Sequence, residues 1–259
     1  MEIVKEQIRK KVARSGNSGA VWVPKDWLGE EILIKRLETK KSLEEEILKI
    51  LLPYLKNISG IFLHGSYARK EETKDSDVDI LVIAENKFKI KADKFDINVI
   101  QADNIEESVR TNAFIYAVIL ESKPIVNSYL LTNLKKIKFN SKDFVKFYID
   151  STKDSILSTK EMIELDRLDG EYITSYSIIY SLILRLRGIF LINCILKNKT
   201  FSNALFKEYL TKHTQEFKKI YDIYRGIRDN KTINTQIEIN SAELLLNLLN
   251  KEIKMLYDK

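Results

Sequence analysis

The stretch IFLHGSYARKEETKDSDVDI, residues 61–80, decides the fold of this chain of 259 residues. It opens in an apolar run that predicts a buried strand over 58–63, and it turns at Gly65-Ser66 into a short helix predicted over 66–72. It closes in a second apolar strand, predicted over 78–83. A strand that leads through a tight turn into a helix and on into another strand indicates a domain of the α/β or α+β class.

The Gly65-Ser66 turn has the chemistry of a phosphate site. The first backbone N–H groups of a helix have no partner within the helix, and the helix dipole is positive at that end. Gly65 has no side chain to keep a phosphate away from the backbone, and the Ser66 hydroxyl is a further donor. The turn therefore predicts a cradle for the triphosphate of a nucleotide.

Two aspartates, Asp77 and Asp79, lie at the start of the second strand. At the period of a strand both carboxylates lie on one face, while Val78 points to the core. Neighbouring carboxylates raise each other's pKa unless a cation lies between them. Magnesium prefers a few carboxylates together with substrate phosphates, so the pair predicts a divalent metal site beside the cradle.

A third carboxylate comes from the next alternating run, which predicts a strand over 95–100 with Asp96 near its start. If this strand lies beside the first pair of aspartates, Asp96 joins them. Two metal ions about 3.5–4 Å apart could then clamp the attacking and leaving oxygens of a phosphoryl displacement. Asp93 precedes the strand and Asp103 follows it, so Asp96 is the better candidate.

The segment GSYARKEETKDSDVDILV, residues 65–82, resembles the signature GS-x-AR-G-x-x-x-x-x-SD-x-D of the nucleotidyltransferase superfamily typified by DNA polymerase β. It is most similar to the small "minimal" prokaryotic nucleotidyltransferases, and the resemblance covers about residues 41–139. One departure is Lys70, where the family usually has glycine. We expect little consequence, because Lys70 is predicted to lie on the short helix.

The resemblance implies a role for each residue of the motif. Gly65 and Ser66 would bind the β- and γ-phosphates of a nucleoside triphosphate, ATP foremost. Asp77 and Asp79 would ligate two Mg²⁺ ions, and Asp96 would ligate the catalytic ion and help to deprotonate the attacking hydroxyl. All three aspartates are thus predicted as catalytic and metal-binding residues.

Arg69 within the motif and His64 directly before it are considered separately. Arg69 is placed with the nucleotide-binding residues, although in such enzymes this arginine more often braces the helix or forms a nearby salt bridge. His64 directly precedes the turn and could touch the substrate. A partly buried packing histidine is the commoner case, and His64 is left out of the predicted site.

The composition excludes several classes of protein. Hydrophobic residues make up 44% and charged residues 31%, which predicts a folded chain of one to three domains. The net charge of +6 fits a phosphate-bearing partner as well as a lysine-rich proteome. The single cysteine, Cys194, excludes an intrachain disulfide and favours a reducing compartment, the cytoplasm. One cysteine and two histidines exclude a thiolate and imidazole zinc site, so any metal is a hard cation on carboxylates.

Neither the N-terminal segment nor the most apolar stretch of the sequence indicates a membrane protein. The first residues, MEIVKEQIRKKV, lack the apolar core of a signal peptide. The most apolar stretch, residues 173–196, carries Arg185 and Arg187 near its middle, where each would cost about 2.5–3.5 kcal/mol in a bilayer. We expect a buried helix there and no membrane partner.

The texture of the sequence predicts three domains in an α+β protein. Residues 1–37 form a small β module, with two short strands around the turn 16–19 and the second strand over 20–23. Residues 41–139 form the nucleotidyltransferase domain, a mixed sheet with amphipathic helices over 42–56 and 106–120 and a last short strand at 125–126. Residues 141–259 form a helical bundle, with helices near 143–165, 172–198, 203–213, 216–230 and 241–257.

The C-terminal bundle resembles the HEPN four-helix fold, which is often partnered or fused with minimal nucleotidyltransferases. The similarity lies in residues 176–183, 200–210 and 217–230. HEPN ribonucleases carry an arginine followed four to six residues later by histidine, and no such histidine follows Arg225 or Arg228, so a ribonuclease is not expected. Together with Arg185 and Arg187, these arginines could contact a nucleotide or an acidic acceptor. Salt bridges within the bundle are the favoured alternative.

The N-terminal segment KVARSGNSGAVWVPK, residues 11–25, resembles the swapped-hairpin DNA-binding modules of the AbrB/SpoVT type. Such modules work as dimers, so the resemblance implies a homodimer or a nucleic-acid partner. The alternative is a small β appendage that packs on the sheet domain.

Two functions follow. The first is a Mg²⁺-dependent nucleotidyltransferase that moves a nucleoside monophosphate, AMP from ATP, onto an acceptor hydroxyl with release of pyrophosphate. The acceptor is a protein, as in toxin–antitoxin pairs, a small molecule such as an aminoglycoside, or an RNA end; the HEPN-like partner in cis favours a protein. The second is a nucleotide-sensing DNA-binding regulator without turnover.

Overall fold

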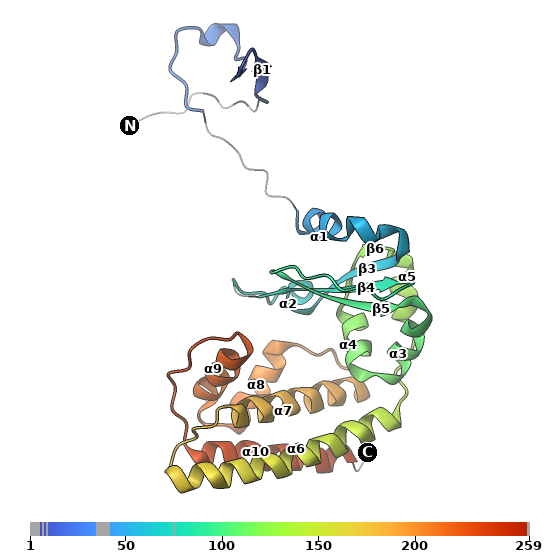
Figure 1. Ribbon diagram of the computed structural model, residues 1–259, viewed down its shortest axis with the longest axis vertical. Helices are drawn as coiled ribbons and strands as arrows, with labels where there is room; N and C mark the ends of the chain where they lie inside the picture. Colours follow the sequence, from blue (N-terminus) through green and yellow to red (C-terminus); the bar gives the residue numbers. More distant parts are fainter. Residues whose placement is uncertain (1–5, 7, 9, 35–41, 75, 258–259) are drawn as a thin grey trace. The chain divides into compact units, whose positions relative to one another are not determined.

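The computed structural model describes residues 6, 8, 10–34, 42–74 and 76–257. They belong to two units, residues 1–43 and 44–259 (Figure 1). The larger unit contains both the predicted sheet domain and the predicted bundle. The domain boundary expected near residue 140 stays a prediction.

The N-terminal unit contains a hairpin of two three-residue strands, β1 (Ala13–Ser15) and β2 (Ser18–Ala20). Gly16 in the turn has φ +59, a left-handed conformation that glycine adopts at little cost. The second strand was predicted over 20–23 but ends at Ala20, and a 3₁₀ turn, η1 (Lys25–Trp27), follows Pro24. None of the described residues of this unit is buried. The DNA-binding and dimer roles stay predictions.

The larger unit contains a four-stranded sheet of order β5-β4-β3-β6, and it is mixed, as the sequence predicts. Its strands are β3 (Ile58–His64), β4 (Val78–Ala84), β5 (Phe95–Gln101) and β6 (Lys123–Val126). β3 is antiparallel to β4 and β6, whereas β4 and β5 are parallel. The predicted strands at 58–63, 78–83 and 95–100 are confirmed. Because β4 and β5 are parallel and in register, their N-terminal ends lie side by side at the same end of the sheet.

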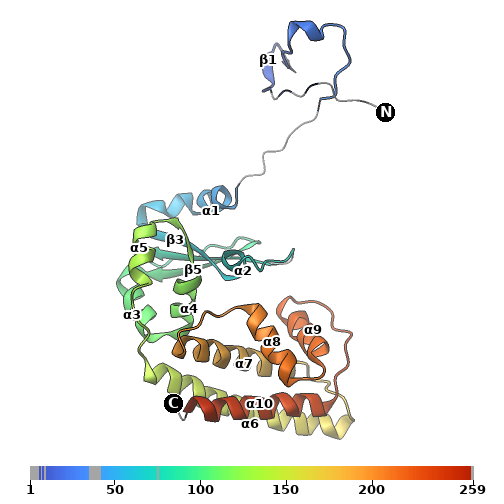
Figure 2. The same ribbon diagram turned by 180° about the vertical axis from the view of Figure 1, so that it is seen from behind.

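Helices cover both faces of this sheet. α1 (Leu43–Leu51) lies on one side, and α3 (Ile105–Thr111) and α4 (Ala113–Glu121) lie on the other, towards the C-terminal helices (Figures 1 and 2). α1 is amphipathic and buries Ile47 and Leu51, but it ends five residues earlier than the predicted end at 56. The reason is Pro53, which cannot donate to the helix ladder, and a 3₁₀ helix, η2 (Leu52–Asn57), takes its place.

The helix predicted over 106–120 is two helices, α3 (Ile105–Thr111) and α4 (Ala113–Glu121). Between them Asn112 has an extended backbone, and its side-chain oxygen accepts hydrogen bonds from the N–H groups of Phe114 and Ile115. An asparagine that caps the next helix competes with continuation of the first one. Both helices pack with Phe62, Leu81 and Ile83 on the sheet face that carries the candidate site.

The short helix after the turn is α2 (Gly65–Arg69), which ends three residues before the predicted end at 72. The prediction that Lys70 lies on this helix is wrong. Lys70 is the C-cap residue, with φ 60 in the left-handed region. Helices commonly end in a left-handed residue, and glycine is favoured there because it has no Cβ. This conformation is a physical reason for glycine at the equivalent position of the motif.

The five C-terminal helices are confirmed. They are α6 (Lys142–Asp169), α7 (Ser177–Leu196), α8 (Asn203–His213), α9 (Phe217–Arg228) and α10 (Ile239–Tyr257), with α5 (Ser128–Leu134) before them. By length and composition α7 is apolar enough to cross a membrane, and it starts five residues later than predicted. Here it buries ten of its twenty residues and packs on α6, α9 and α10, as a core helix does.

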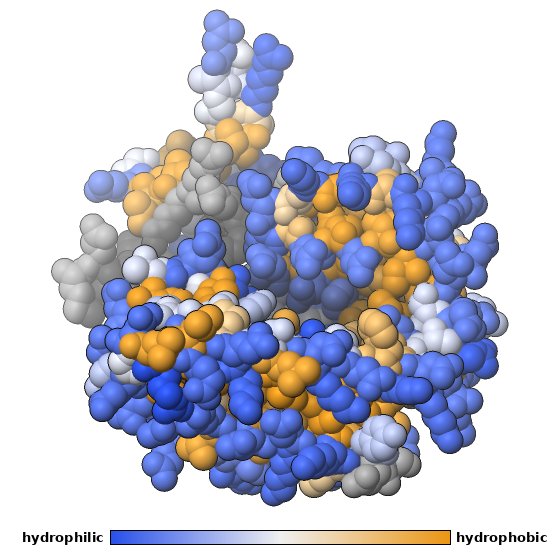
Figure 3. All heavy atoms as spheres, turned by 60° about the horizontal axis from the view of Figure 1, so that its bottom comes forward, coloured by the Kyte–Doolittle hydropathy of each residue, from blue (hydrophilic) through white to orange (hydrophobic). Residues whose placement is uncertain are grey.

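The helical region and the sheet domain are joined through α4. Phe114 of α4 makes edge-on ring contacts with Phe144 and Tyr148 of α6, and α4 also contacts α7. On the face seen in Figure 3, apolar side chains gather in patches that hydrophilic side chains border. The aromatic contacts hold the helical region against the face of the sheet that carries the candidate site.

Candidate active site

Strand register places three of the polar side chains in a row across the sheet. His64 on β3 lies opposite Asp79 on β4, and Asp79 lies opposite Asp96 on β5. Residues that pair directly across strands have side chains on the same face. Asp77 is two residues before Asp79, just ahead of β4, and it is exposed. The structure therefore brings the predicted site residues Asp79 and Asp96 together, with Asp77 beside them.

Asp79 lies among other negative charges. The pKa of Asp79 is raised to about 6, first by burial and then by the charges of Asp96, Glu121 and Asp77, while Arg69 opposes the rise. Among the described residues no hydrogen-bond donor contacts its carboxylate. A carboxylate in this state is destabilised by its neighbours, and a bound cation would relieve the repulsion.

The donor set fits magnesium, although it is not a finished cage. Within the described ranges, no three His, Cys, Asp or Glu side chains lie close enough together to hold a metal by themselves. Magnesium commonly keeps several waters and binds one or two carboxylates plus substrate phosphates. Asp79 and Asp96, with Asp77 nearby, are such a set. Their role as metal ligands stays a prediction.

Gly65 is required by two independent features of the turn. Its φ of +70 lies in the left-handed region. A Cβ at this position would lie 1.8 Å from Asp79 Oδ2 and 2.6 Å from Asp79 Cγ. The Asp79 carboxylate therefore packs directly against the Gly65 backbone, and any side chain at position 65 would displace it.

Glu121, at the end of α4, belongs to the site although the sequence analysis did not include it. Its Oε1 accepts a hydrogen bond of 2.8 Å from the Gly65 N–H, and its Oε2 accepts one of 2.5 Å from Arg69 Nη1. His64 Nδ1 is 4.0 Å from Oε1, and burial lowers the pKa of His64 although Glu121 and Asp96 oppose this. The available signal was an acid that ends the otherwise apolar helix AFIYAVILE, residues 113–121.

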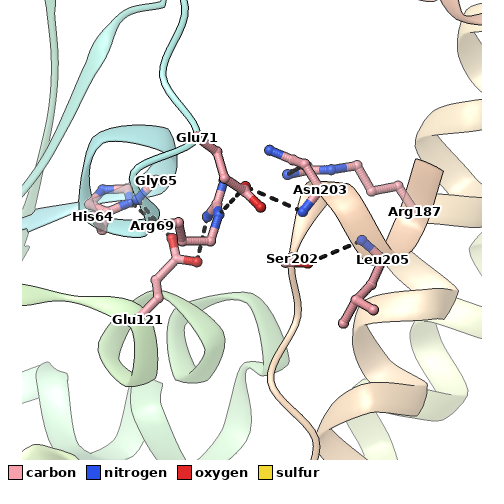
Figure 4. A network of polar contacts seen from close by, with 9 residues as sticks. All are labelled: His64, Gly65, Arg69, Glu71, Glu121, Arg187, Ser202, Asn203 and Leu205. Carbon is pink, nitrogen blue, oxygen red and sulfur yellow. Dashed lines mark hydrogen bonds and ion pairs between the residues drawn. The ribbon is translucent and has the colours of Figure 1, made fainter. Parts of the chain in front are cut away.

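Arg69 braces the turn in this structure. Its Nε donates to Glu71 Oε2 at 2.8 Å, and its other contact is with Glu121, so two carboxylates hold one guanidinium (Figure 4). Only 12% of its side chain is exposed. Burial disfavours the charge, but the hydrogen bonds from Arg69 to Glu71 and Glu121 raise the pKa of Arg69 overall. This is the bracing role named in the sequence analysis; direct contact with a nucleotide stays a prediction.

Comparison with known proteins agrees with this geometry. Residues 44–158 match the family model described as "Nucleotidyltransferase domain". Over these residues the chain is therefore similar to nucleotidyltransferase domains. The match runs from α1 into α6, so most of the helical region lies beyond it. The α+β fold expected from the motif is confirmed. The HEPN and AbrB resemblances stay predictions.

Solved structures include two distant relatives of the fold. A nucleotidyltransferase-like protein from Exiguobacterium sibiricum 255-15 is 14% identical, with a TM-score of 0.37 over 82% of this chain and 74% of that chain. The spectinomycin adenyltransferase AAD(9) from Enterococcus faecialis, solved with ATP and spectinomycin, is 15% identical, with a TM-score of 0.43 over 81% of this chain and 97% of that chain. No curated protein matches the chain. At this level of likeness neither structure bears on the acceptor or the mechanism.

The helical region touches the nucleotidyltransferase domain at the candidate site. The Asn203 N–H, at the start of α8, points to Glu71 Oε2 at 3.4 Å. The Phe201 ring lies between two guanidinium groups, with Arg69 at 5.9 Å and Arg187 at 5.1 Å from its centroid. Arg187 Nη2 also donates to Asn203 Oδ1 at 3.5 Å (Figure 4). The segment at the start of α8 therefore contacts Arg69 and Glu71, which brace the Gly65-Ser66 turn.

The four arginines singled out in the bundle fall into two groups. Arg225 and Arg228 both pair with Asp229, at 2.9 and 2.8 Å, as the favoured alternative predicts. Arg185 donates to Ser151 and lies over Tyr148. Over the part of the chain that the structure describes, neither Arg185 nor Arg187 has a carboxylate partner. Of the four, Arg187 lies near the Gly65-Ser66 turn, because it shares the Phe201 ring with Arg69.

Proposed function

We propose that the chain is a Mg²⁺-dependent nucleotidyltransferase that transfers a nucleoside monophosphate from a triphosphate, with ATP as the expected donor, to an acceptor hydroxyl. The observation that carries the proposal is the placement of Asp79 and Asp96 side by side, with Asp79 packed against the Gly65 backbone. A phosphate cradle and a carboxylate pair in contact are what an in-line displacement at the α-phosphorus requires.

The residues of the site divide the tasks of this reaction. Ser66 offers its hydroxyl to the triphosphate at the start of α2, and Asp77, Asp79 and Asp96 would hold the ions, which when bound stabilise charge on the attacking and leaving oxygens. Asp96 is exposed near the start of an edge strand, where an acceptor can reach it. Its carboxylate takes the hydroxyl proton as the acceptor oxygen bonds to the α-phosphorus. The bond from the α-phosphorus to the bridging oxygen breaks, and pyrophosphate leaves.

The test uses labelled ATP with MgCl₂ and follows pyrophosphate release and transfer of label. Asp77→Asn and Asp79→Asn should lower both signals by about 10²–10³-fold while circular dichroism stays unchanged. Asp93→Asn is the matched control, because Asp93 is an exposed aspartate just before β5. Unchanged turnover in the Asp79→Asn variant would overturn the proposal.

For the acceptor we take a protein hydroxyl first, as in toxin–antitoxin systems of this superfamily, and a small molecule or an RNA end next. The brace that joins the helical region to the turn supports an acceptor or nucleotide that touches both regions. A labelled band on a denaturing gel after incubation with cell extract supports a protein acceptor. Label that migrates only with small molecules or RNA supports the other two.

The second candidate function is a DNA-binding regulator that senses a nucleotide without turnover. It is favoured by one observation: the N-terminal hairpin belongs to a unit separate from the nucleotidyltransferase domain. Duplex binding that weakens steeply with salt, together with ATP binding and no pyrophosphate release, would support it. Turnover that depends on Asp79 would exclude it.

A further inference from the structure

Arg69 lies between two carboxylates that come from opposite directions. Glu121 approaches from the end of α4, and Glu71 lies two residues after the end of α2. Both carboxylates are largely buried, with 13% and 22% of their side chains exposed, against 12% for Arg69. Charge-assisted hydrogen bonds in such surroundings are stronger than those on the surface. The three side chains therefore form one rigid group rather than a solvated ion pair.

Each carboxylate also has a second partner, and both partners are backbone N–H groups. Glu121 Oε1 takes the N–H of Gly65, the first residue of α2. Glu71 takes the N–H of Asn203 and also that of Ala204, at the start of α8. Burial opposes the charge of Glu71, but Arg69 and these two N–H groups lower the pKa of Glu71 overall. The Ser202 hydroxyl caps Leu205, so Glu71 and Ser202 share the first turn of α8 (Figure 4).

The Gly65 end of this group matters for the reaction, because the Gly65 backbone packs directly against Asp79. A turn that shifts by a fraction of an ångström would move the cradle relative to the Asp79 carboxylate. The Gly65 N–H is already bonded to Glu121, so a phosphate at this turn would bind other donors, the Ser66 hydroxyl among them.

On this basis, and resting on the proposed function, we infer that Glu121 and Glu71 are positioning residues for the nucleotide. Glu121 positions the Gly65 amide against Asp79 through its hydrogen bond to the Gly65 N–H. Glu71 connects the turn to the start of α8. Arg69 bonds to both carboxylates and so connects Glu121 with Glu71. Nucleotide affinity then depends on the contact between Glu71 and the start of α8. The start of α8 lies outside both the motif and the residues that match the family model.

The first experiment measures the contacts without activity. Hydrogen exchange of the full chain, read by mass spectrometry, should be faster over residues 64–71 in Glu121→Ala than in the wild type. Glu71→Ala should speed exchange over 64–71 and also over 202–206. Glu106→Ala is the control for the loss of an exposed glutamate and should change neither segment. Exchange in Glu121→Ala equal to that in Glu106→Ala would overturn the inference.

The second experiment measures the consequence for the nucleotide. KM for Mg·ATP should rise on the order of tenfold in Glu121→Ala, and less in Glu71→Ala, with a smaller change in kcat. Glu121→Gln keeps one oxygen acceptor for the Gly65 N–H and should recover part of the loss; it also replaces the alanine variant if that one fails to fold. An unchanged KM in Glu121→Ala would contradict a positioning role.

The two proposals fail in different ways. A wild-type chain that neither binds Mg·ATP nor releases pyrophosphate overturns the proposed function and, with it, the positioning role. A wild type that turns over, with Glu121→Ala and Glu71→Ala kinetically equal to Glu106→Ala, overturns only the positioning role.

Discussion

Two aspartates, one in each region of the larger unit, have opposite surroundings, and their pKa values shift in opposite directions. Asp166 of α6 is 4% exposed, and its carboxylate accepts four hydrogen bonds from the backbone and hydroxyls of Thr174 and Ser175. Burial opposes its charge, but these donors hold the pKa of Asp166 below its usual range. Over the described residues the Asp79 carboxylate has no such donors, and burial together with its negative neighbours raises the pKa of Asp79 to about 6. A satisfied carboxylate stabilises a fold, whereas an unsatisfied one indicates that a ligand completes it.

The largest expected effect is loss of activity in Asp79→Asn. We expect turnover to fall by about 10²–10³-fold, as it does when a group that stabilises transition-state charge is removed. Stability at pH 7 should rise at the same time, by on the order of 1 kcal/mol after allowing for solvent screening, because the cost of burying the charge and the repulsion with Asp96 and Glu121 are both removed. Pyrophosphate release and urea unfolding measure the two quantities. A variant that is both inactive and less stable would place Asp79 in the same class as Asp166.

The matching change in the helical region should do the reverse. Asp166→Asn replaces one acceptor oxygen by a donor that faces the N–H and hydroxyl groups of Thr174 and Ser175. We expect unfolding free energy to fall by about 2–3 kcal/mol, with activity per folded molecule retained. Urea unfolding and active-site titration together separate the two effects. A loss of turnover without a loss of stability would break the comparison.

The pH dependence of stability sharpens the contrast. The raised pKa of Asp79 means that the folded state binds the proton more tightly, so its ionisation costs stability as pH rises from about 4 to about 6. The advantage of Asp79→Asn should therefore grow over that window and vanish below it. The lowered pKa of Asp166 has the opposite sign: its contribution is present above about pH 4 and is lost in acid. Unfolding free energies of both variants from pH 3 to pH 7 test this, and parallel curves would contradict it.

The sequence predicts the local part of this structure well. Strands 58–63, 78–83 and 95–100 and the five C-terminal helices follow from periodicity, which each segment carries within itself. The helix break at Asn112 was missed because a capping side chain outweighs an unbroken apolar pattern. Glu121 was missed because it is 56 residues from the amide that it binds, and only the packing of α4 against α2 brings them together. The pairing of Asp79 with Asp96 needed the register of two parallel strands, which the motif leaves open.

The smallest expected effect tests the one departure from the motif. Lys70 has a left-handed backbone at the end of α2, next to the brace formed by Arg69. That conformation costs a non-glycine residue about 1 kcal/mol, and glycine avoids this cost. Glycine also raises the conformational entropy of the unfolded state, which offsets part of the gain. Lys70→Gly should therefore raise unfolding free energy by about 0.5 kcal/mol, with activity kept, because the Lys70 side chain makes none of the contacts that hold the turn. Urea unfolding of Lys70→Gly beside Lys70→Ala decides the matter, since alanine removes the same charge but keeps the Cβ. If both variants gain equally, the charge of Lys70 and not its backbone is the source of the effect.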